Sequence, residues 1–421
     1  MNSVSSITVY KVFHLLYVML FVSMAFSLRA VSSIVIGIML FAGLFLNTAG
    51  LKYFARDRHW TLFLFTIILF LLLQFVAFLF TDNLQQSWSN IRVKSGLLLV
   101  PLAISATSSY IRSADKLFFH YCLVLAAASL YCLIYNLQSP GTNGILSVLF
   151  YHGLVAPIGQ HAVYFSILVL IAIFYLAEKL LFKPHLRGRN LNLFFLIYFS
   201  IFLFLLSSKF AIGFWFLGAI YYSFNFFNVH RVRVVTLSVM LVAGIAVASF
   251  TKNPVQSRFA DVFKGELSLV TQDQFNQADY FNGFQFRLLQ WRFVPEILTQ
   301  QKAWWLGVSP GDAQSALNDK YAATNMYTGD PGRNDLGYRA YNTHNQYLET
   351  TLQNGITGLL LLVLVCYSLV KLVLARRNRL ANAVLLTLMA WLFIEATFET
   401  QYGVLIFLLF PLLTAKLPTN K

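Results

Sequence analysis

A polar stretch, YNTHNQYLETTLQNGITG at 341–358, stands directly before one of the most apolar runs of the chain. His344 is the fourth residue of this stretch, and Asn345, Glu349 and Gln353 follow at a spacing of four, which places these three on one helix face. An Asn-Gly pair then breaks that helix. A histidine at a helix start is more often structural. This one lies in a polar wedge at a membrane surface and can accept a proton near pH 7, so we predict that it acts on a substrate.

Three cations on the same predicted side of the membrane can bind an anionic group. Arg287 lies in the run FQFRLLQWRF, and a guanidinium in an apolar setting needs an anionic partner, for which phosphate is well suited. Arg292, in the same run, is an alternative for this role. Lys209 follows a Ser-Ser pair between two apolar runs. It either faces an anionic head group or extends its amine to the membrane surface.

Two further polar patches adjoin predicted spans. QHAVYFS contains His161 and Tyr164, and FETQYG contains Glu399 and Gln401. Ionisable groups at membrane depth are costly, so each is a functional candidate.

Glu395 and Glu399 are four residues apart, near or within the membrane, so we expect at least one of them to be paired. Arg92 or Lys94, before the fourth predicted span, is a candidate partner. Helix pairing and substrate contact explain these carboxylates equally well.

Repeated apolar runs make up most of the chain. Of its 421 residues 58% are hydrophobic and 11% charged, whereas soluble domains carry about 25% charged residues. Runs of about 20 apolar residues can cross a bilayer, so we predict an all-α polytopic membrane protein with about twelve transmembrane helices. The first run lacks a small-residue cleavage site and is expected to stay as a helix. The predicted spans are 12–28, 31–50, 61–81, 95–110, 118–137, 162–181, 191–207, 210–228, 233–250, 355–375, 381–397 and 402–415.

Basic residues are distributed unevenly between the two sides of this arrangement. With both termini in the cytoplasm, the cytoplasmic segments contain 18 Lys and Arg, and the short outer loops contain four. This asymmetry follows the positive-inside rule and predicts that both termini are cytoplasmic. The net charge of +15 therefore reflects topology, and we do not expect a nucleic-acid partner.

One long segment, about 251–345, separates the ninth and tenth spans and lies outside the cytoplasmic membrane in this topology. Its nine basic residues are balanced by nine acidic ones. A loop of this length is usually functional or disordered. We therefore divide the chain into spans one to nine (1–250), a partly helical periplasmic loop domain (251–345), and a helix start with the last three spans (346–421).

Several signals predict order within the loop. Apolar residues at helical spacing predict a helix over 284–298, with Phe284, Leu288, Trp291, Val294 and Leu298 on its apolar face. Asp312 is placed to cap the start of a second helix, AQSALNDKYAA. Residues 324–340, rich in Gly, Asp and Asn, predict a mobile lid or exposed loop.

No cysteine or motif points to a cofactor. Cys122, Cys132 and Cys366 all lie within predicted spans, so we expect no structural disulfide. The chain has no Cys/His metal spacing and no HExxH, GxSxG or GxxxxGK[ST] motif, so we expect neither a metal nor another cofactor.

Taken together, these features resemble the O-antigen ligase and polymerase superfamily of bacterial lipid-linked glycan transferases. The likeness includes the span number, the long loop, a basic residue after a Ser pair, a loop arginine and a His-Asn-x-x-x-Glu helix start. THNQYLETTLQNGITGLL (343–360) and FRLLQW (286–291) contribute most, supported by SSKF (207–210) and HAVYFS (161–166). The architectural likeness covers nearly the whole chain.

The resemblance implies a metal-independent glycosyltransferase at the periplasmic face of a bacterial inner membrane. Its donor is a glycan on undecaprenyl pyrophosphate. The acceptor is a sugar hydroxyl of the lipid A core in a ligase, or a second lipid-linked glycan in a polymerase. By motif, His344 corresponds to the catalytic histidine and Arg287 to the loop arginine that holds the pyrophosphate. Lys209 stands where the family usually has arginine; lysine keeps the charge but loses the two-pronged hydrogen bonding.

The implied chemistry is a single displacement with inversion, in which His344 activates or orients the acceptor hydroxyl and Asn345 or Glu349 orients His344. The candidate substrate contacts are Arg292, Asn345, Glu349, His161, Tyr164, Arg92, Glu399 and Gln401. A transporter of lipid-linked sugars is an alternative for a twelve-span protein. Transporters place their polar residues near the membrane midplane, whereas here these gather at the outer face, which favours an enzyme.

Overall fold

The computed structural model describes residues 3–46, 57–139, 148–182, 188–227, 256, 260, 267–333 and 335–416. The predicted ninth span, 233–250, lies outside the described residues. Within them, regular structure is helical apart from one isolated bridge between Asp330 and Asp335. The helices are α1 (Ser3–Ala25), α2 (Arg29–Leu46), α4 (Arg58–Phe78), α5 (Leu84–Lys94), α6 (Gly96–Thr107), α7 (Ala114–Gln138), α9 (Tyr151–Val155), α10 (Ala162–Phe182), α11 (Arg189–Leu205), α12 (Lys209–Phe227), α15 (Gly283–Gln300), α16 (Ala313–Ala323), α17 (Gln346–Leu374), α18 (Arg379–Trp391) and α19 (Gln401–Thr414).

Seven stretches of the described chain are long and apolar enough to cross a membrane. Apolar side chains such as Phe41, Phe45 and Leu79 are exposed on the outside of the bundle, where lipid would cover them. These features confirm an all-helical, multi-pass membrane protein, while the count of twelve spans stays a prediction. The seven stretches are Thr8–Ala25, Arg29–Leu46, Arg58–Phe78, Leu84–Tyr110, Ala114–Gln138, Ala162–Phe182 and Gln346–Leu374, and shorter apolar helices cover Arg189–Leu205, Arg379–Trp391 and Gln401–Thr414.

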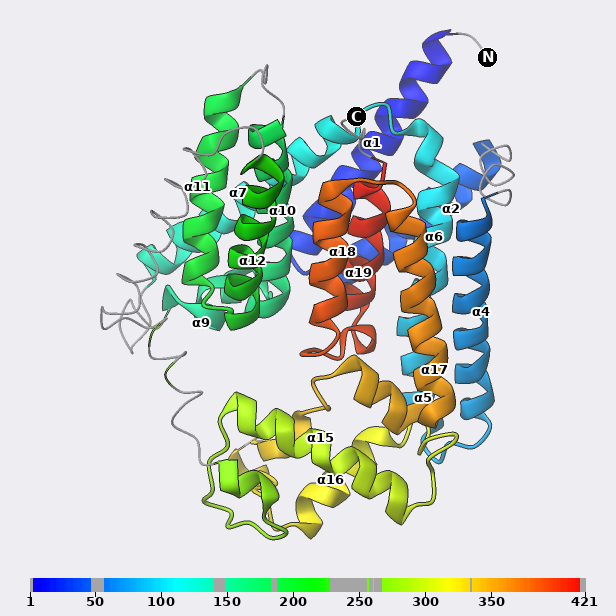
Figure 1. Ribbon diagram of the computed structural model, residues 1–421, viewed down its shortest axis with the longest axis vertical. Helices are drawn as coiled ribbons and strands as arrows, with labels where there is room; N and C mark the ends of the chain where they lie inside the picture. The colour runs from blue at the N-terminus through cyan, green and yellow to red at the C-terminus, as the bar shows by residue number, and fades with distance from the viewer. Residues whose placement is uncertain are drawn as a thin grey trace.

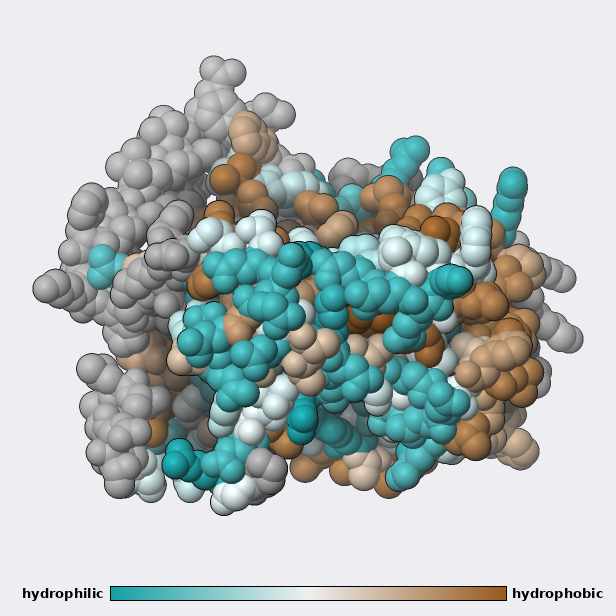
Figure 2. Space-filling model, turned by 90° about the horizontal axis from the view of Figure 1, so that it is seen from below, coloured by the Kyte–Doolittle hydropathy of each residue, from teal (hydrophilic) through white to brown (hydrophobic). Residues whose placement is uncertain are grey.

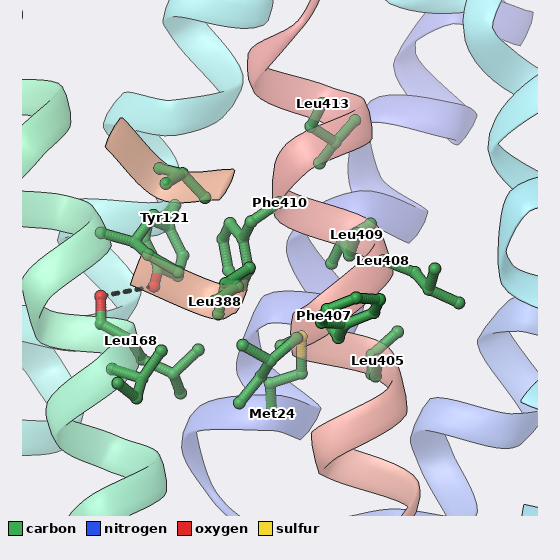
Figure 3. Packing of buried hydrophobic residues seen from close by; sticks show 14 of the residues in the cluster. Met24, Tyr121, Leu168, Leu388, Leu405, Phe407, Leu408, Leu409, Phe410 and Leu413 are labelled. Atoms are coloured by element: carbon green, nitrogen blue, oxygen red, sulfur yellow. Dashed lines mark hydrogen bonds between the residues drawn. The ribbon is translucent and has the colours of Figure 1, made fainter. Parts of the chain in front are cut away.

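The last helix, α19, forms the centre of the bundle. It is apolar all round, as expected for a helix surrounded by others, and packs against α6, α10 and α18. Figure 3 shows Phe410 of α19 beside Tyr121 of α7, with ring centroids 5.0 Å apart. The Tyr121 hydroxyl donates a hydrogen bond of 2.7 Å to the carbonyl of Leu168 in α10. The C-terminal span thereby joins the two sides of the bundle.

The segment 267–345, here called the loop segment, lies beyond one end of the bundle, and both chain termini lie toward the other end (Figure 1). We call these the loop end and the far end. Viewed from the loop end, polar side chains gather over the middle of the molecule and apolar ones over the flank at the right of the view (Figure 2). The hydropathy of the surface therefore changes where the chain leaves the membrane-spanning bundle.

The loop segment has an apolar core of its own, built mainly on α15 and α16. Asn282 caps α15 by accepting hydrogen bonds from the backbone N–H groups of Phe284 and Gln285, and the Gln285 side chain completes a capping box. The helix predicted at 284–298 is therefore present. Of the predicted apolar face, Val294 and Leu298 are buried, whereas Phe284 is exposed and Leu288 and Trp291 are half-buried. The other buried residues of the helix are Gln285, Phe286, Leu289, Gln290, Phe293 and Ile297.

Asp312 anchors the loop segment to the bundle and does not cap α16 through its side chain as predicted. Its carboxylate accepts hydrogen bonds from the Thr81 hydroxyl at 3.0 Å and from the backbone N–H groups of Asp82 and Asn83, between α4 and α5. The Ser309 hydroxyl donates a fourth at 2.6 Å. Burial opposes ionisation, but these hydrogen bonds outweigh it and lower the pKa of Asp312.

A second anchor lies at the predicted break in the tenth span, where Gly355 has φ +63° and interrupts α17. The backbone of residues 303–309 fits against this break: Ile356 N–H donates to the Trp304 carbonyl at 2.8 Å, and Val308 N–H donates to the Leu352 carbonyl at 2.9 Å. A methyl group at Gly355 would lie 2.3 Å from the carbonyl carbon of Trp305. Glycine is therefore required here for both its backbone conformation and its lack of a side chain.

The remaining part of the loop, 324–340, is an exposed loop over most of 332–339, one of the two predicted alternatives, but it is held to the loop core at both ends. The Asp330–Asp335 bridge closes a compact turn, and Met326 is buried. Tyr338 packs on Phe286 of α15 with ring centroids 4.8 Å apart. Aromatic packing thus holds this glycine-rich stretch against the loop core.

Candidate functional site

His344 lies in a short connection that its neighbours hold in place. Its φ of +47° is unusual for a residue other than glycine, although histidine tolerates this region better than most. Asn345 caps α17 by accepting hydrogen bonds from the N–H groups of Tyr347 and Leu348. Glu349 accepts hydrogen bonds from both the backbone N–H and the hydroxyl of Thr343. Asn345 and Glu349 thus fix the backbone around His344. The prediction that one of them orients the imidazole is wrong, because neither hydrogen-bonds to the ring.

The group that faces the imidazole is Glu395. Its carboxylate lies 3.8 Å from His344 Nδ1, an atom that is buried and has no hydrogen-bond partner among the described residues. Glu395 and Glu399 are not one turn apart on a helix as predicted, because α18 ends at Trp391 and the chain turns irregularly before α19. Gln346 holds that turn, donating its backbone N–H to the Leu392 carbonyl at 2.8 Å and accepting one from the Phe398 N–H at 2.6 Å.

Arg287 is the cation of α15 that keeps unused hydrogen-bonding capacity. Its Nη1 donates to the Gly283 carbonyl at 3.1 Å, while its Nε is buried without a partner. No carboxylate pairs with it in the part of the chain that the structure describes. A sequence of aromatic contacts links its helix to the histidine: Phe286 packs on Tyr341 at 5.5 Å, and Tyr341 on His344 at 5.8 Å between ring centroids.

Arg292 has a different environment, because its donors are occupied. Its guanidinium pairs with Asp273 at 2.8 Å and with Glu296 at 2.6 Å. It also donates to the carbonyls of Val270 and Gln272 at 2.8 and 2.7 Å. These contacts hold the chain before α15 against that helix. Of the two arginines left open by the sequence, Arg287 is the one with donors available for an anion.

His161, just before α10, lies within electrostatic reach of the same groups. Burial lowers its pKa, the Glu395 carboxylate acts in the opposite direction, and the charges of His344 and Arg287 lower it further. Its ring also packs on His152 at 4.4 Å between centroids. Four groups from separate elements, Arg287, His344, Glu395 and His161, therefore form one electrostatic cluster at the loop end of the bundle. We call them the loop-end cluster.

Comparison with known proteins identifies the segment that carries two of the four residues of this cluster, Arg287 and His344. Residues 193–363 match the family model described as O-antigen ligase. This segment belongs to the O-antigen ligase family. The match confirms the resemblance noted in the sequence, and the matched segment includes Lys209, Arg287 and His344. No curated protein matches the chain at a significant level.

Within the O-antigen ligase segment, Lys209 reaches the loop end by topology. α10 begins at Ala162, next to His161, and runs away from the loop-end cluster, and α11 returns, so the turn before α12 lies at the loop end. Ser207 and Ser208 are buried in that turn, where Ser207 has φ +50°. Lys209 is the first residue of α12 and is partly exposed. The structure thus places it at the same end as Arg287 and His344.

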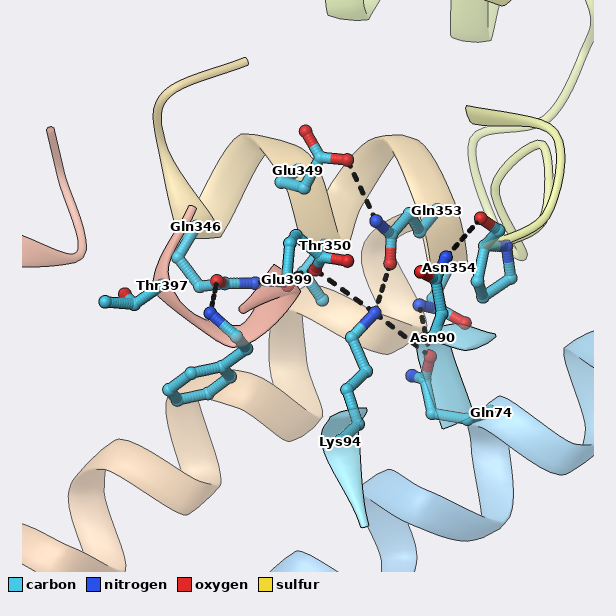
Figure 4. Close-up of polar contacts among 12 residues, drawn as sticks. Gln74, Asn90, Lys94, Gln346, Glu349, Thr350, Gln353, Asn354, Thr397 and Glu399 are labelled. Atoms are coloured by element: carbon cyan, nitrogen blue, oxygen red, sulfur yellow. Dashed lines mark hydrogen bonds and ion pairs between the residues drawn. The ribbon is translucent and has the colours of Figure 1, made fainter. Parts of the chain in front are cut away.

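A second polar cluster lies beside the first turns of α17 (Figure 4). Lys94 is buried and forms an ion pair of 3.2 Å with Glu399, so Lys94 and not Arg92 is the partner anticipated for this carboxylate. The amine also donates to Gln353 and, at 3.5 Å, to Gln74. Lys94 reaches this depth because the fourth span begins at Leu84, earlier than the predicted residue 95. We call this group the Lys94 network.

The other candidate substrate contacts link helices of the bundle or face outward. The Tyr164 hydroxyl is hydrogen-bonded to Thr400 at 3.0 Å, which joins α10 to the start of α19. Gln401 donates to the Arg29 carbonyl at 3.0 Å and to the Ser33 hydroxyl at 2.8 Å. Arg92 is exposed on α5.

Three residues in or beside the loop-end cluster were not among the site residues predicted from the sequence, namely Glu395, His152 and Tyr341. The sequence predicted Glu395 only as a carboxylate near the membrane, with helix pairing and substrate contact left open, and not as the partner of His344. Its position beside His344 depends on the irregular turn after α18, and no local sequence pattern predicts that turn. The only signal was its rarity, since an acidic residue at membrane depth is a functional candidate.

Proposed function

We propose that this protein transfers a glycan from undecaprenyl pyrophosphate to a sugar hydroxyl of the lipid A core, at the periplasmic face of a bacterial inner membrane. The observation that carries the proposal is the convergence of a histidine and an arginine with unused polar atoms, at the loop end of the bundle, inside an O-antigen ligase segment. Arg287 and His344 are half-buried, so their electrostatic interactions are strong while a substrate can still reach them.

Arg287 and Lys209 hold the pyrophosphate in this proposal. The leaving group is already a diphosphate, so it needs stabilisation of charge more than protonation. Arg287 Nε has no partner, and a guanidinium can bind a phosphate through two parallel hydrogen bonds. Lys209 supplies a second positive charge from the bundle side. With two cations from the chain, no step of the proposal requires a metal ion.

His344 acts on the acceptor in this proposal. The acceptor hydroxyl oxygen forms a bond to the anomeric carbon, the bond from that carbon to the pyrophosphate breaks, and the diphosphate leaves with the electron pair. The hydroxyl proton passes to the imidazole of His344. Glu395, 3.8 Å from Nδ1, stabilises the resulting imidazolium and leaves Nε2 for the acceptor. Attack opposite to the leaving group inverts the anomeric configuration.

Reconstitution of the full-length protein in liposomes tests the proposal. The donor is a purified glycan on undecaprenyl pyrophosphate, offered with a lipid A core or alone. The expected product is a glycosylated lipid A core. Chain growth from donor alone identifies a polymerase that joins lipid-linked units. Movement of the donor across the bilayer without any glycosidic product identifies a transporter and contradicts the proposal.

A matched pair of charge variants makes the test specific. Arg287→Gln should lose binding of the donor, whereas Lys302→Asn, which removes an exposed positive charge from the same loop segment, should keep it. Lys302 has φ +53°, which asparagine tolerates, so the control should fold normally. Equal loss in both variants would mean that only the overall charge of the loop matters.

A further inference from the structure

Two cavities adjoin one another at the far end of the bundle, away from the proposed active site. One, of about 580 Å³, lies between the ends of α4, α6, α17 and α19 and the start of α7. The other, of about 430 Å³, lies between α1 and the start of α7. Arg112 and Ser113 line both cavities, so Arg112 stands where the two adjoin, and we call the two cavities together the hollow.

Positive charge exceeds negative charge in this hollow. Of the carboxylates nearby, Asp115 is paired with Lys179 at 3.0 Å, and Asp57 with Arg376 at 2.7 Å. Arg112 lies over the ring of Tyr10 at 3.9 Å and forms no ion pair with a carboxylate of the described chain.

Three lysines also line the two cavities. Lys11 and Lys116 line the smaller cavity, and Lys416 lines the larger one. Burial, and next the charge of Arg376, lower the pKa of Lys416 to about 7, so a bound anion would relieve an unfavourable arrangement.

The walls of the hollow are apolar beside these cations. Ile104, Leu372 and Leu412 line the larger cavity, and Leu15 and Val18 line the smaller one. Aromatic side chains that favour a membrane interface stand at the same level, namely Trp60, Tyr10 and Tyr110. A small soluble anion gains nothing from apolar walls, whereas the acyl chains of a lipid would pack against them.

We propose that this hollow binds the phosphate head group of an anionic phospholipid, with Arg112 as the central cation and Lys11, Lys116 and Lys416 around it. Basic pockets between membrane helices are suited to such head groups, and each cation near the surface contributes to the attraction. The phosphate lies against Arg112, and the acyl chains follow the apolar walls. This site is independent of the proposed transfer reaction, since it lies at the other end of the bundle.

Native mass spectrometry of the full-length protein tests the site. The protein is purified in detergent with equal amounts of phosphatidylglycerol and phosphatidylethanolamine. The wild type should retain the anionic lipid preferentially. The double variant Arg112→Gln/Lys116→Gln should retain it roughly tenfold less or lower still. Equal retention of the two lipids by the wild type would overturn the proposal.

Two further variants separate a built site from general charge. Arg377→Gln removes a positive charge from the same end but lines neither cavity, so it should retain lipid as the wild type does. Arg112→Lys keeps the charge and should retain most of the binding, even if the double variant folds poorly. Loss in Arg377→Gln equal to that in the double variant would contradict the site. In a competition experiment, millimolar inorganic phosphate is added to the lipid-bound protein. Displacement of the lipid by phosphate would show that the site binds a soluble anion and would overturn the assignment.

Discussion

The Lys94 network and the loop-end cluster lie at the same end of the bundle, and both depend on the first turns of α17. In the Lys94 network the charged side chains have partners: Lys94 pairs with Glu399, and Glu349 accepts three hydrogen bonds, one of them from Gln353. The atoms left without a partner there, Gln74 Nε2 and Asn354 Oδ1, belong to neutral amides. In the loop-end cluster Arg287 Nε and His344 Nδ1 are buried without a partner. The two polar groups therefore differ in how completely the atoms of their charged and titratable side chains are hydrogen-bonded.

The difference separates a structural role from a functional one. A buried ion pair with matched hydrogen bonds fixes the position of the helices that carry it, and breaking it is costly. Buried polar atoms without partners lower stability, so their presence requires an explanation such as a bound substrate. In this protein the Lys94 network holds α17, and α17 presents His344 to the neighbouring cluster. Variants of each group should therefore change different properties.

The largest effect is expected for His344→Ala in glycan transfer. Loss of a general base lowers turnover by about 10²- to 10⁴-fold, while folding should be nearly unchanged because the imidazole contributes no hydrogen bond. Transfer from purified lipid-linked donor measures the first property, and thermal unfolding in detergent the second. An active His344→Ala protein would remove the proposed role and leave the loop-end cluster without its central group.

Lys94→Met should instead lower stability. Removal of one partner from a buried pair leaves the Glu399 charge uncompensated, and the free energy of unfolding should fall by about 3–5 kcal/mol. Denaturation of the full-length protein in mixed detergent micelles measures this change. Lys94→Met/Glu399→Leu should recover much of the loss. A destabilised single variant that the double variant does not improve would show that the pair is not the cause.

Arg287→Ala and Arg292→Ala form a matched pair within one helix. Loss of a charged hydrogen bond to phosphate should weaken donor binding in Arg287→Ala by about 1.5–3 kcal/mol, with stability kept. Arg292→Ala should keep donor affinity and lose about 1 kcal/mol of stability, since its partner Asp273 is largely exposed. Titration with labelled lipid-linked donor and thermal unfolding distinguish the two. A reversed pattern would assign the anion to Arg292.

The smallest effect is a pH dependence from His161. Its pKa is lower in the folded protein than the ordinary 6.5, so the folded state holds this proton less readily than the unfolded chain. The contribution of neutral His161 to stability is therefore complete above pH 6.5. It is lost as the pH falls from 6.5 through the lower pKa of the folded protein. His161→Gln should therefore show a smaller drop in unfolding temperature between pH 7 and pH 5 (roughly the range in which histidines titrate) than the wild type. Identical pH profiles would place His161 outside the loop-end cluster.

Local sequence patterns predicted much of the fold. Apolar runs identified the membrane helices, and the Asn-Gly pair predicted the break in α17 at Gly355. The motif around His344 and the loop arginine predicted the family that residues 193–363 match. These features are encoded in neighbouring residues, because hydropathy and backbone preference act over a few turns of chain.

Tertiary structure alone decided which groups meet. Asp312 has the residue type and position of a helix cap, but its carboxylate binds the backbone at Asp82 and Asn83. Arg292 has Glu296 four residues later on the same helix, which local sequence can supply, but its second carboxylate, Asp273, comes from another segment and only the fold brings it there. Glu395 reaches His344 through a turn after α18 that Gln346 holds from another helix. Hydropathy decides where a segment lies, whereas pairing of charges depends on contacts between segments far apart in the chain.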